Sequence, residues 1–200
     1  MGGSIGNCYI CRLLISINKI MENKTTIAKS ATQYGLLLGV ITIFEFVIGY
    51  ILNIDPQTNK TFGIVMNIAN LLILPFIFTY IACNHYKNKI NEGFISFGQC
   101  LKTGVTIGLI SSVVYGIFYF VFTLIFPEFV PELIEKIMSI TIKERPSITK
   151  EELDMSLSIM QKMMNPYVTI PLSIVMNCFI YLIHSLIVGA IVKKDANQSF

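Results

Sequence analysis

The stretch TGVTIGLISSVVYGIFYFVFTLIF, residues 103–126, decides the fold, because it contains no charged residue over its whole length. A helix needs about 20 predominantly apolar residues to cross the roughly 30 Å hydrocarbon core of a bilayer. Three further stretches meet this requirement: residues 34–54, 62–83 and 167–192. Glu45 is the only charged residue in the four stretches. The sequence therefore predicts an all-α polytopic membrane protein with four transmembrane helices.

The composition of the whole chain excludes an ordinary soluble domain. Apolar residues make up 54% of the 200 residues and charged residues only 14%, against about 25% charged residues in a typical globular domain. The mean hydropathy of +0.66 agrees with this. The net charge of +3 is too small to indicate a nucleic-acid partner. The expected surroundings are the lipid bilayer, and we expect no nucleic acid to bind.

Lysine and arginine predict the orientation of the spans. Basic residues precede the first span, fill the loop between the second and third, and follow the fourth: Arg12, Lys19, Lys24, Lys29, Lys87, Lys89, Lys102, Lys193 and Lys194. Because cytoplasmic loops carry the excess of Lys and Arg, we expect both termini inside the cell. Residues 127–165 then form an extracytoplasmic loop between the third and fourth spans.

The first twenty residues differ from the rest of the chain. Their longest apolar run, residues 13–17, is too short for a secretory signal. Met21 begins a natural opening, Met-Glu-Asn-Lys-Thr-Thr. We therefore expect residues 1–20 to be disordered or to come from an over-extended start, and residues 21–200 to form a single four-helix membrane domain.

Glycine placement and loop lengths carry a family resemblance. The matching features are Tyr34-Gly35-x-x-x-Gly39, the stretch Gly93-Phe-Ile-Ser-Phe-Gly98, Gly104, Gly108-Leu-Ile-Ser-Ser112, the acidic third loop and the closing Lys193-Lys194. Over about residues 25–195 the chain resembles a family of small four-helix bacterial membrane proteins, mostly from Bacteroidetes, called domain-of-unknown-function family 4199. The resemblance implies four spans and the bacterial inner (cytoplasmic) membrane, and it implies no activity.

Small residues recur every fourth position on two spans. One stripe contains Gly35 and Gly39, and the other contains Gly104, Gly108, Ser112 and Gly116. Such spacing places small residues on one helix face, where the backbones of two helices approach closely. Packing within one bundle is favoured, with the two stripes against each other in parallel. A homodimer face is the alternative.

Glu45 is the most informative polar residue, because it lies near the middle of a span, where a charge is costly. Depth along the spans suggests Asn177, His184, Ser111 and Ser112 as its partners, whereas Asn67 and Asn70 are poorer ones. A protonatable site in which Glu45 and His184 relay protons or bind a cation is one interpretation. The other is a neutral carboxylic acid that fixes the register of the helices through hydrogen bonds.

The loop of residues 127–165 contains one clear helix signal. Thr149 followed by Glu152 matches a capping box. Leucine and methionine then recur at helical spacing, at Leu153, Leu157, Met160 and Met164. The methionines of this segment, Met155, Met160, Met163 and Met164, are soft ligands that suit Cu(I), but packing is the more common role of such a stripe. The five cysteines show no disulfide framework, and we expect no metal and no cofactor.

The sequence contains no catalytic signature. The two histidines lie on different segments, and no nucleophile elbow, phosphate loop or zinc-protease motif is present. We therefore expect no enzyme. The favoured function is a non-catalytic membrane component, such as an accessory or assembly subunit with a membrane protein partner. The alternative is a small oligomeric transporter or channel-like protein that uses Glu45.

Overall fold

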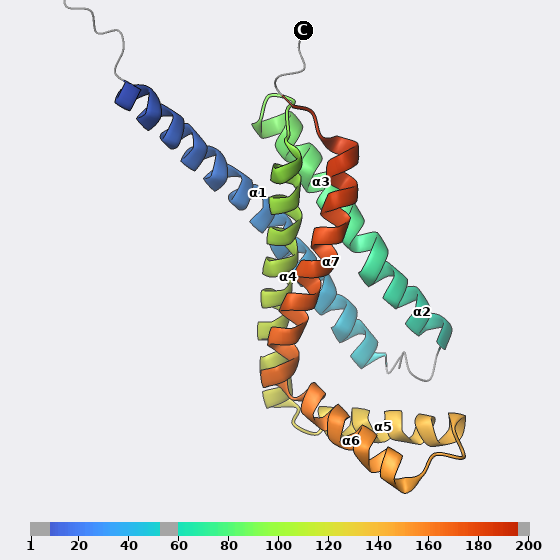
Figure 1. The fold of residues 1–200 in the computed structure, drawn as a ribbon. Helices are drawn as coiled ribbons and strands as arrows, with labels where there is room; N and C mark the ends of the chain where they lie inside the picture. Colours follow the sequence, from blue (N-terminus) through green and yellow to red (C-terminus); the bar gives the residue numbers. More distant parts are fainter. Residues whose placement is uncertain (1–8, 53–59, 196–200) are drawn as a thin grey trace, which may run out of the picture.

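The structure is a computed structural model that describes the backbone of residues 9–52 and 60–195 and the side chains of residues 27–52 and 61–195. Figure 1 shows that the described chain is built from helices. In chain order they are α1 (Tyr9–Ile51), α2 (Lys60–Ile68), the π-helix η1 (Ala69–Ile73), α3 (Leu74–His85), the π-helix η2 (Tyr86–Ile90), α4 (Phe97–Ile125), α5 (Phe129–Glu144), α6 (Lys150–Met164) and α7 (Pro166–Val192).

Four segments of the described chain are long and apolar enough to cross a membrane. They are Ile27–Ile51, Thr61–Ile90, Phe97–Ile125 and Pro166–Val192. These spans confirm the predicted all-α fold with four transmembrane helices. The second span extends further towards the C-terminus than predicted, and the third begins earlier. Helix α1 already begins at Tyr9, residues 1–8 lie outside the described residues, and the start at Met21 stays a prediction.

Helices α4 and α7 form the central pair of the bundle, and α1 and α3 pack beside them. Helix α1 packs on α4, while α3 packs mainly on α7. In Figure 1 the first half of α1 projects away from the bundle, and α2 diverges from α7. Helices α3, α4 and α7 therefore lie together near Val192, and the bundle is splayed where α2 stands away from α7, towards α5 and α6.

The glycine stripes contact helices of the same chain, but they do not face each other. A Cβ atom at Gly35 or Gly39 would lie 2.8 Å from the Cβ of Ile110 or Val114 on α4. The stripe on α4 faces α7 instead: Gly104 lies against Ser185, Gly108 against Tyr181 and Gly116 against Ile170. The predicted contact between the two stripes is therefore wrong. Helix α4 turns its small face towards α7 and its branched side chains towards α1.

Pro75 explains the shape of the second span. Proline has no amide hydrogen, and its ring clashes with the carbonyl four residues earlier. The chain is π-helical just before this point, over Ala69–Ile73, and the Leu74 N–H donates to the Ala69 carbonyl, five residues back. A π-bulge of this kind bends a helix. The bend carries α2 away from α7 and leaves space between α1 and α2.

The loop of residues 127–165 forms a helical hairpin, α5 and α6, which crosses the ends of α4 and α7 in Figure 1. The predicted capping box is confirmed, because the Thr149 hydroxyl accepts from the Glu152 N–H and the Glu152 carboxylate accepts from the Thr149 N–H. The predicted stripe of Leu153, Leu157, Met160 and Met164 is the half-buried face of α6. Helix α5 was not predicted separately.

Contact between α4 and α7 predicts the effect of one added methyl group. In Gly108→Ala the new Cβ would lie 2.8 Å from Cγ and 2.9 Å from Cβ of Tyr181, atoms held by the backbone of α7. Overpacking of this kind costs about 1–3 kcal/mol. We expect Gly108→Ala to unfold at a lower temperature than the wild type in detergent micelles.

Gly98→Ala is the matched control on the same helix, because nothing lies within 4 Å of a Cβ at that position. We expect this variant to be as stable as the wild type. Equal unfolding temperatures for Gly98→Ala and Gly108→Ala would contradict the packing described here.

Candidate functional site

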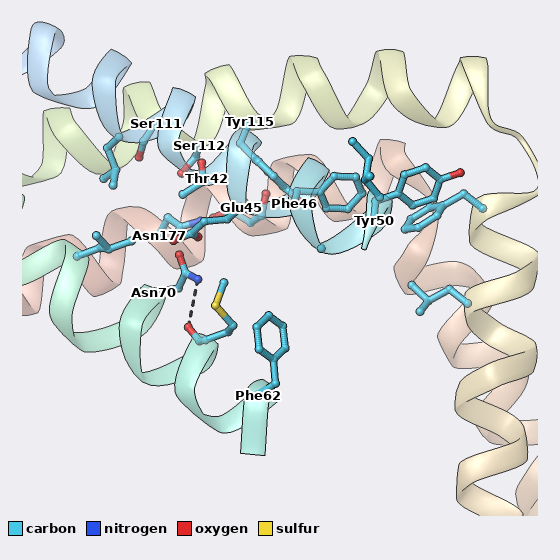
Figure 2. Close-up of a pocket in the computed structure, with 18 of the residues that line it drawn as sticks. Thr42, Glu45, Phe46, Tyr50, Phe62, Asn70, Ser111, Ser112, Tyr115 and Asn177 are labelled. Carbon is cyan, nitrogen blue, oxygen red and sulfur yellow. Dashed lines mark hydrogen bonds between the residues drawn. The ribbon is translucent and has the colours of Figure 1, made fainter. Parts of the chain in front are cut away.

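A cavity of about 880 Å³ lies in the splayed half of the bundle, between α1, α2, η1, α4 and α7, with α5 across one end (Figure 2). Its wall is unusually polar for a space between apolar helices. Twelve of its lining residues carry a polar or charged side chain: Thr42, Glu45, Tyr50, Asn70, Ser111, Ser112, Tyr115, Glu132, Lys136, Ser173, Asn177 and Tyr181. Polar groups within spans face the bundle interior or a water-filled cavity, which this arrangement provides.

The Glu45 side chain projects from α1 and lies in the middle of this wall. Figure 2 shows its carboxylate near Thr42 and Asn177, with Asn70 on the opposite side. The side chain is half-buried. Among the residues drawn in Figure 2, none forms a hydrogen bond with Glu45. The carboxylate therefore faces the cavity, where a ligand or water has access to it.

The serine and threonine hydroxyls near Glu45 present acceptors to the cavity, because each donates its single hydrogen to a carbonyl of its own helix. The two asparagine amides each donate one of their two N–H groups in the same way. The Thr42 hydroxyl donates to Gly39 (2.9 Å), and the Ser111 and Ser112 hydroxyls donate to Gly108 (3.2 and 2.6 Å). The Ser173 hydroxyl donates to Ile170 (2.8 Å), the Asn177 amide to Ser173 (3.0 Å) and the Asn70 amide to Met66 (3.1 Å). Each hydroxyl oxygen keeps a free lone pair.

The structure brings four of the five predicted polar residues together and leaves one out. Glu45, Asn177, Ser111 and Ser112 line the cavity, but His184 does not. The His184 ring is buried and its Nδ1 lies 2.8 Å from the carbonyl oxygen of Ile180, one turn earlier on α7. A direct relay between Glu45 and His184 through this cavity therefore has no support in the described geometry.

Asn70 lines the cavity although its depth made it a poorer partner. The π-helix η1 contains Asn70, and Pro75 is the sequence signal that locates this bend. Glu132 and Lys136 were also missed, because they belong to α5, whose position across the cavity comes from tertiary packing. Asn67 is exposed and does not line the cavity.

Side chains that ligate metals do not cluster in the described part of the chain. No group of three His, Cys, Asp or Glu side chains there is arranged to hold a metal ion. Cys83, Cys100 and Cys178 are free. The side chains of Cys8 and Cys11 lie outside the described residues.

Fold and cavity together define a class, the multi-pass membrane proteins built on a four-helix bundle with a polar intramembrane cavity. The sequence model of a family described as "Protein of unknown function (DUF4199)" matches residues 33–194, so the chain belongs to this family. The search of curated proteins and the search of solved structures gave no match. The family confirms the resemblance seen in the sequence, and it assigns no activity.

Access of water to the cavity is testable at a pair of adjacent residues. Asn177 lines the cavity, whereas Met176 lies at nearly the same depth and is 53% exposed on the outside of the bundle. A thiol reacts through its thiolate, which forms in water and not in hydrocarbon. In a Cys178→Ala background, we expect Asn177→Cys to react with a small charged methanethiosulfonate much faster than Met176→Cys.

Cys178 is replaced in this experiment because it is adjacent to the reporter and only half-buried. The buried Cys83 and Cys100 remain in both variants, so their background is the same. Equal rates for the two variants would mean that the cavity is closed to water.

Proposed function

We propose that the protein binds a small organic cation in its intramembrane cavity, with Glu45 as the counter-charge, and takes part in moving that cation across or out of the membrane. This is the transporter or channel-like alternative inferred from the sequence. A volume of about 880 Å³ falls within the range of about 300–1,000 Å³ typical of small-molecule sites. It is far larger than a single inorganic ion requires.

One observation carries the proposal: a carboxylate faces a cavity whose neighbouring serine and threonine hydroxyls already donate their hydrogens to the backbone. Such a wall offers lone pairs and negative charge, so it favours a ligand that brings positive charge and hydrogen-bond donors. Among the side chains that the structure describes, the lining contains two carboxylates, Glu45 and Glu132, and one ammonium group, Lys136. Glu132 and Lys136 are four residues apart on α5, where opposite charges are neighbours.

The predicted role as a non-catalytic accessory or assembly subunit remains a second proposal, because the described spans expose large apolar side chains around the bundle. Lipid and a partner protein both suit such a surface. Gentle purification from the native membrane is its test. A partner that co-purifies in stoichiometric amount would support the subunit, and a bundle of this chain alone would contradict it.

Charge removal at Glu45 tests the cation site. We expect saturable binding of radiolabelled tetraethylammonium to the wild-type protein in lipid nanodiscs. Glu45→Gln keeps the size of the side chain and removes its charge, so it should weaken binding by about tenfold or more, which corresponds to at least about 1.4 kcal/mol. Glu45→Asp keeps the charge and should retain part of the affinity.

Glu135→Gln is the matched control, because Glu135 is exposed on α5 and does not line the cavity. It removes the same charge from the protein and should bind like the wild type. Wild-type protein without saturable binding, or equal binding by Glu45→Gln, would contradict the proposal.

The proposed location is the bacterial inner membrane with both termini in the cytoplasm, which is supported by the distribution of Lys and Arg. Green fluorescent protein fused to the C-terminus should then fluoresce, because it matures in the cytoplasm. Alkaline phosphatase inserted after Arg145, in the turn between α5 and α6, should be active because it requires the oxidising side. The reverse pattern would place α5 and α6 in the cytoplasm.

A further inference from the structure

A second cavity lies beside the first, under the α5–α6 hairpin. Its volume is about 640 Å³, and its wall is formed by the ends of α4 and α7 together with α5 and α6. Helix α6 contributes three methionines, Met160, Met163 and Met164, along with Ile159. We call this space the methionine chamber, and the cavity around Glu45 the carboxylate chamber.

The methionine chamber has the opposite chemistry to the carboxylate chamber. None of its lining residues is charged. Its serine and threonine hydroxyls donate to backbone carbonyls: Ser156 to Glu152, Thr169 to Asn165 and Ser173 to Ile170. Methionine is unbranched and polarizable, so it adapts to apolar groups of irregular shape. The chamber therefore suits hydrocarbon.

The two chambers adjoin, because five residues line both: Phe46, Tyr115, Phe129, Leu133 and Ser173. Phe46 is one residue after Glu45. The centroid of its ring lies 5.6 Å from that of Phe129 and 6.2 Å from that of Tyr115, in edge-to-face contacts. The junction is thus made of three aromatic side chains, one leucine and one serine. Aromatic edges and faces contact both a cation and an alkyl chain favourably.

We infer that the ligand of the Glu45 site is an amphiphilic cation, with its ammonium group in the carboxylate chamber and its apolar chain in the methionine chamber. The inference rests on the proposed function and specifies its substrate class. One molecule then satisfies both chambers: the head compensates the Glu45 charge, and the chain fills the apolar space.

The negative charge of the carboxylate chamber disfavours phospholipids, the most abundant membrane amphiphiles, as ligands. A phospholipid carries a phosphate, and the carboxylate chamber faces it with Glu45, Glu132 and oxygen acceptors. Lys136 is the one cation among the described side chains of the lining. A single-chain amine or quaternary ammonium compound has no such repulsion.

The chain contains no tryptophan, so one introduced indole reports from a single place. The reporter variant is Met160→Trp, which lies in the methionine chamber. Its matched control is Met155→Trp on the same helix, at a position 67% exposed and outside both chambers. The ligand is an alkyltrimethylammonium ion with a bromine at the end of a ten-carbon chain, because bromine quenches indole fluorescence on contact.

We expect the bromoalkylammonium to quench Met160→Trp in nanodiscs with a saturable component that Met155→Trp lacks. Adding Glu45→Gln should raise the half-saturating concentration by about tenfold or more, equivalent to at least about 1.4 kcal/mol. A bromoalkanol of the same length has no charge, and its quenching should not depend on Glu45.

Two outcomes would overturn the inference while leaving the cation site intact. In the first, tetraethylammonium binds in a Glu45-dependent manner but the bromine quenches neither reporter saturably. In the second, both reporters are quenched equally, as expected when the amphiphile only dissolves in the lipid. Absence of any Glu45-dependent cation binding would instead contradict the proposed function itself.

Ile159→Trp is a second reporter, because Ile159 lines the same chamber at its exposed edge. This second reporter is needed if the indole of Met160→Trp occupies the space that the alkyl chain of the ligand would fill. In that case Met160→Trp should lose affinity for the ten-carbon ligand and keep its affinity for tetraethylammonium, which also supports the inference. Equal loss of affinity for both ligands in Met160→Trp, together with no saturable quenching of Ile159→Trp, would contradict it.

Discussion

The close contact between α4 and α7 is the interaction on which the rest of the structure depends. Gly104, Gly108 and Gly116 place the backbone of α4 directly against side chains of α7. In a bilayer the hydrophobic effect does not drive helices together, so association relies on van der Waals contact between closely approaching helices. Because the glycines of α4 contact α7, α1 packs against larger side chains on another face of α4.

Satisfaction of polar groups sets the chemistry of the cavity around Glu45. In hydrocarbon, a hydroxyl or amide hydrogen without an acceptor is costly, and the carbonyl one turn earlier on the same helix is always within reach. Thr42, Ser112 and Ser173 all use this acceptor. For these three hydroxyls, stability of the empty protein therefore leaves oxygen lone pairs, and not hydrogens, directed at the cavity. The proposed preference for a cation follows from how serine and threonine are accommodated within membrane helices.

The residue order along α1 places two chemistries side by side. Glu45 belongs to the acceptor-rich wall, and Phe46 belongs to the aromatic junction with Tyr115 and Phe129. Successive residues on a helix project about 100° apart, so one turn of α1 serves both chambers. The α5–α6 hairpin completes the methionine chamber, which gives the loop between the third and fourth spans a structural role beyond connection.

Sequence alone determined the four spans, the capping box at Thr149 and the depth at which Glu45, Ser111, Ser112 and Asn177 meet. These are local or one-dimensional properties, since bilayer thickness fixes span length and a capping box involves four adjacent residues. Only the tertiary structure decided which faces of the helices meet and how far apart they lie. His184 is two turns from Asn177 but lies where α4 and α7 are closely packed, near Gly104 and Ser185. Asn70 enters the wall because a π-helical bend before Pro75 directs α2 away from α7. Hydropathy gives the depth of a residue in the membrane, whereas the distance between two helices depends on the side chains of both.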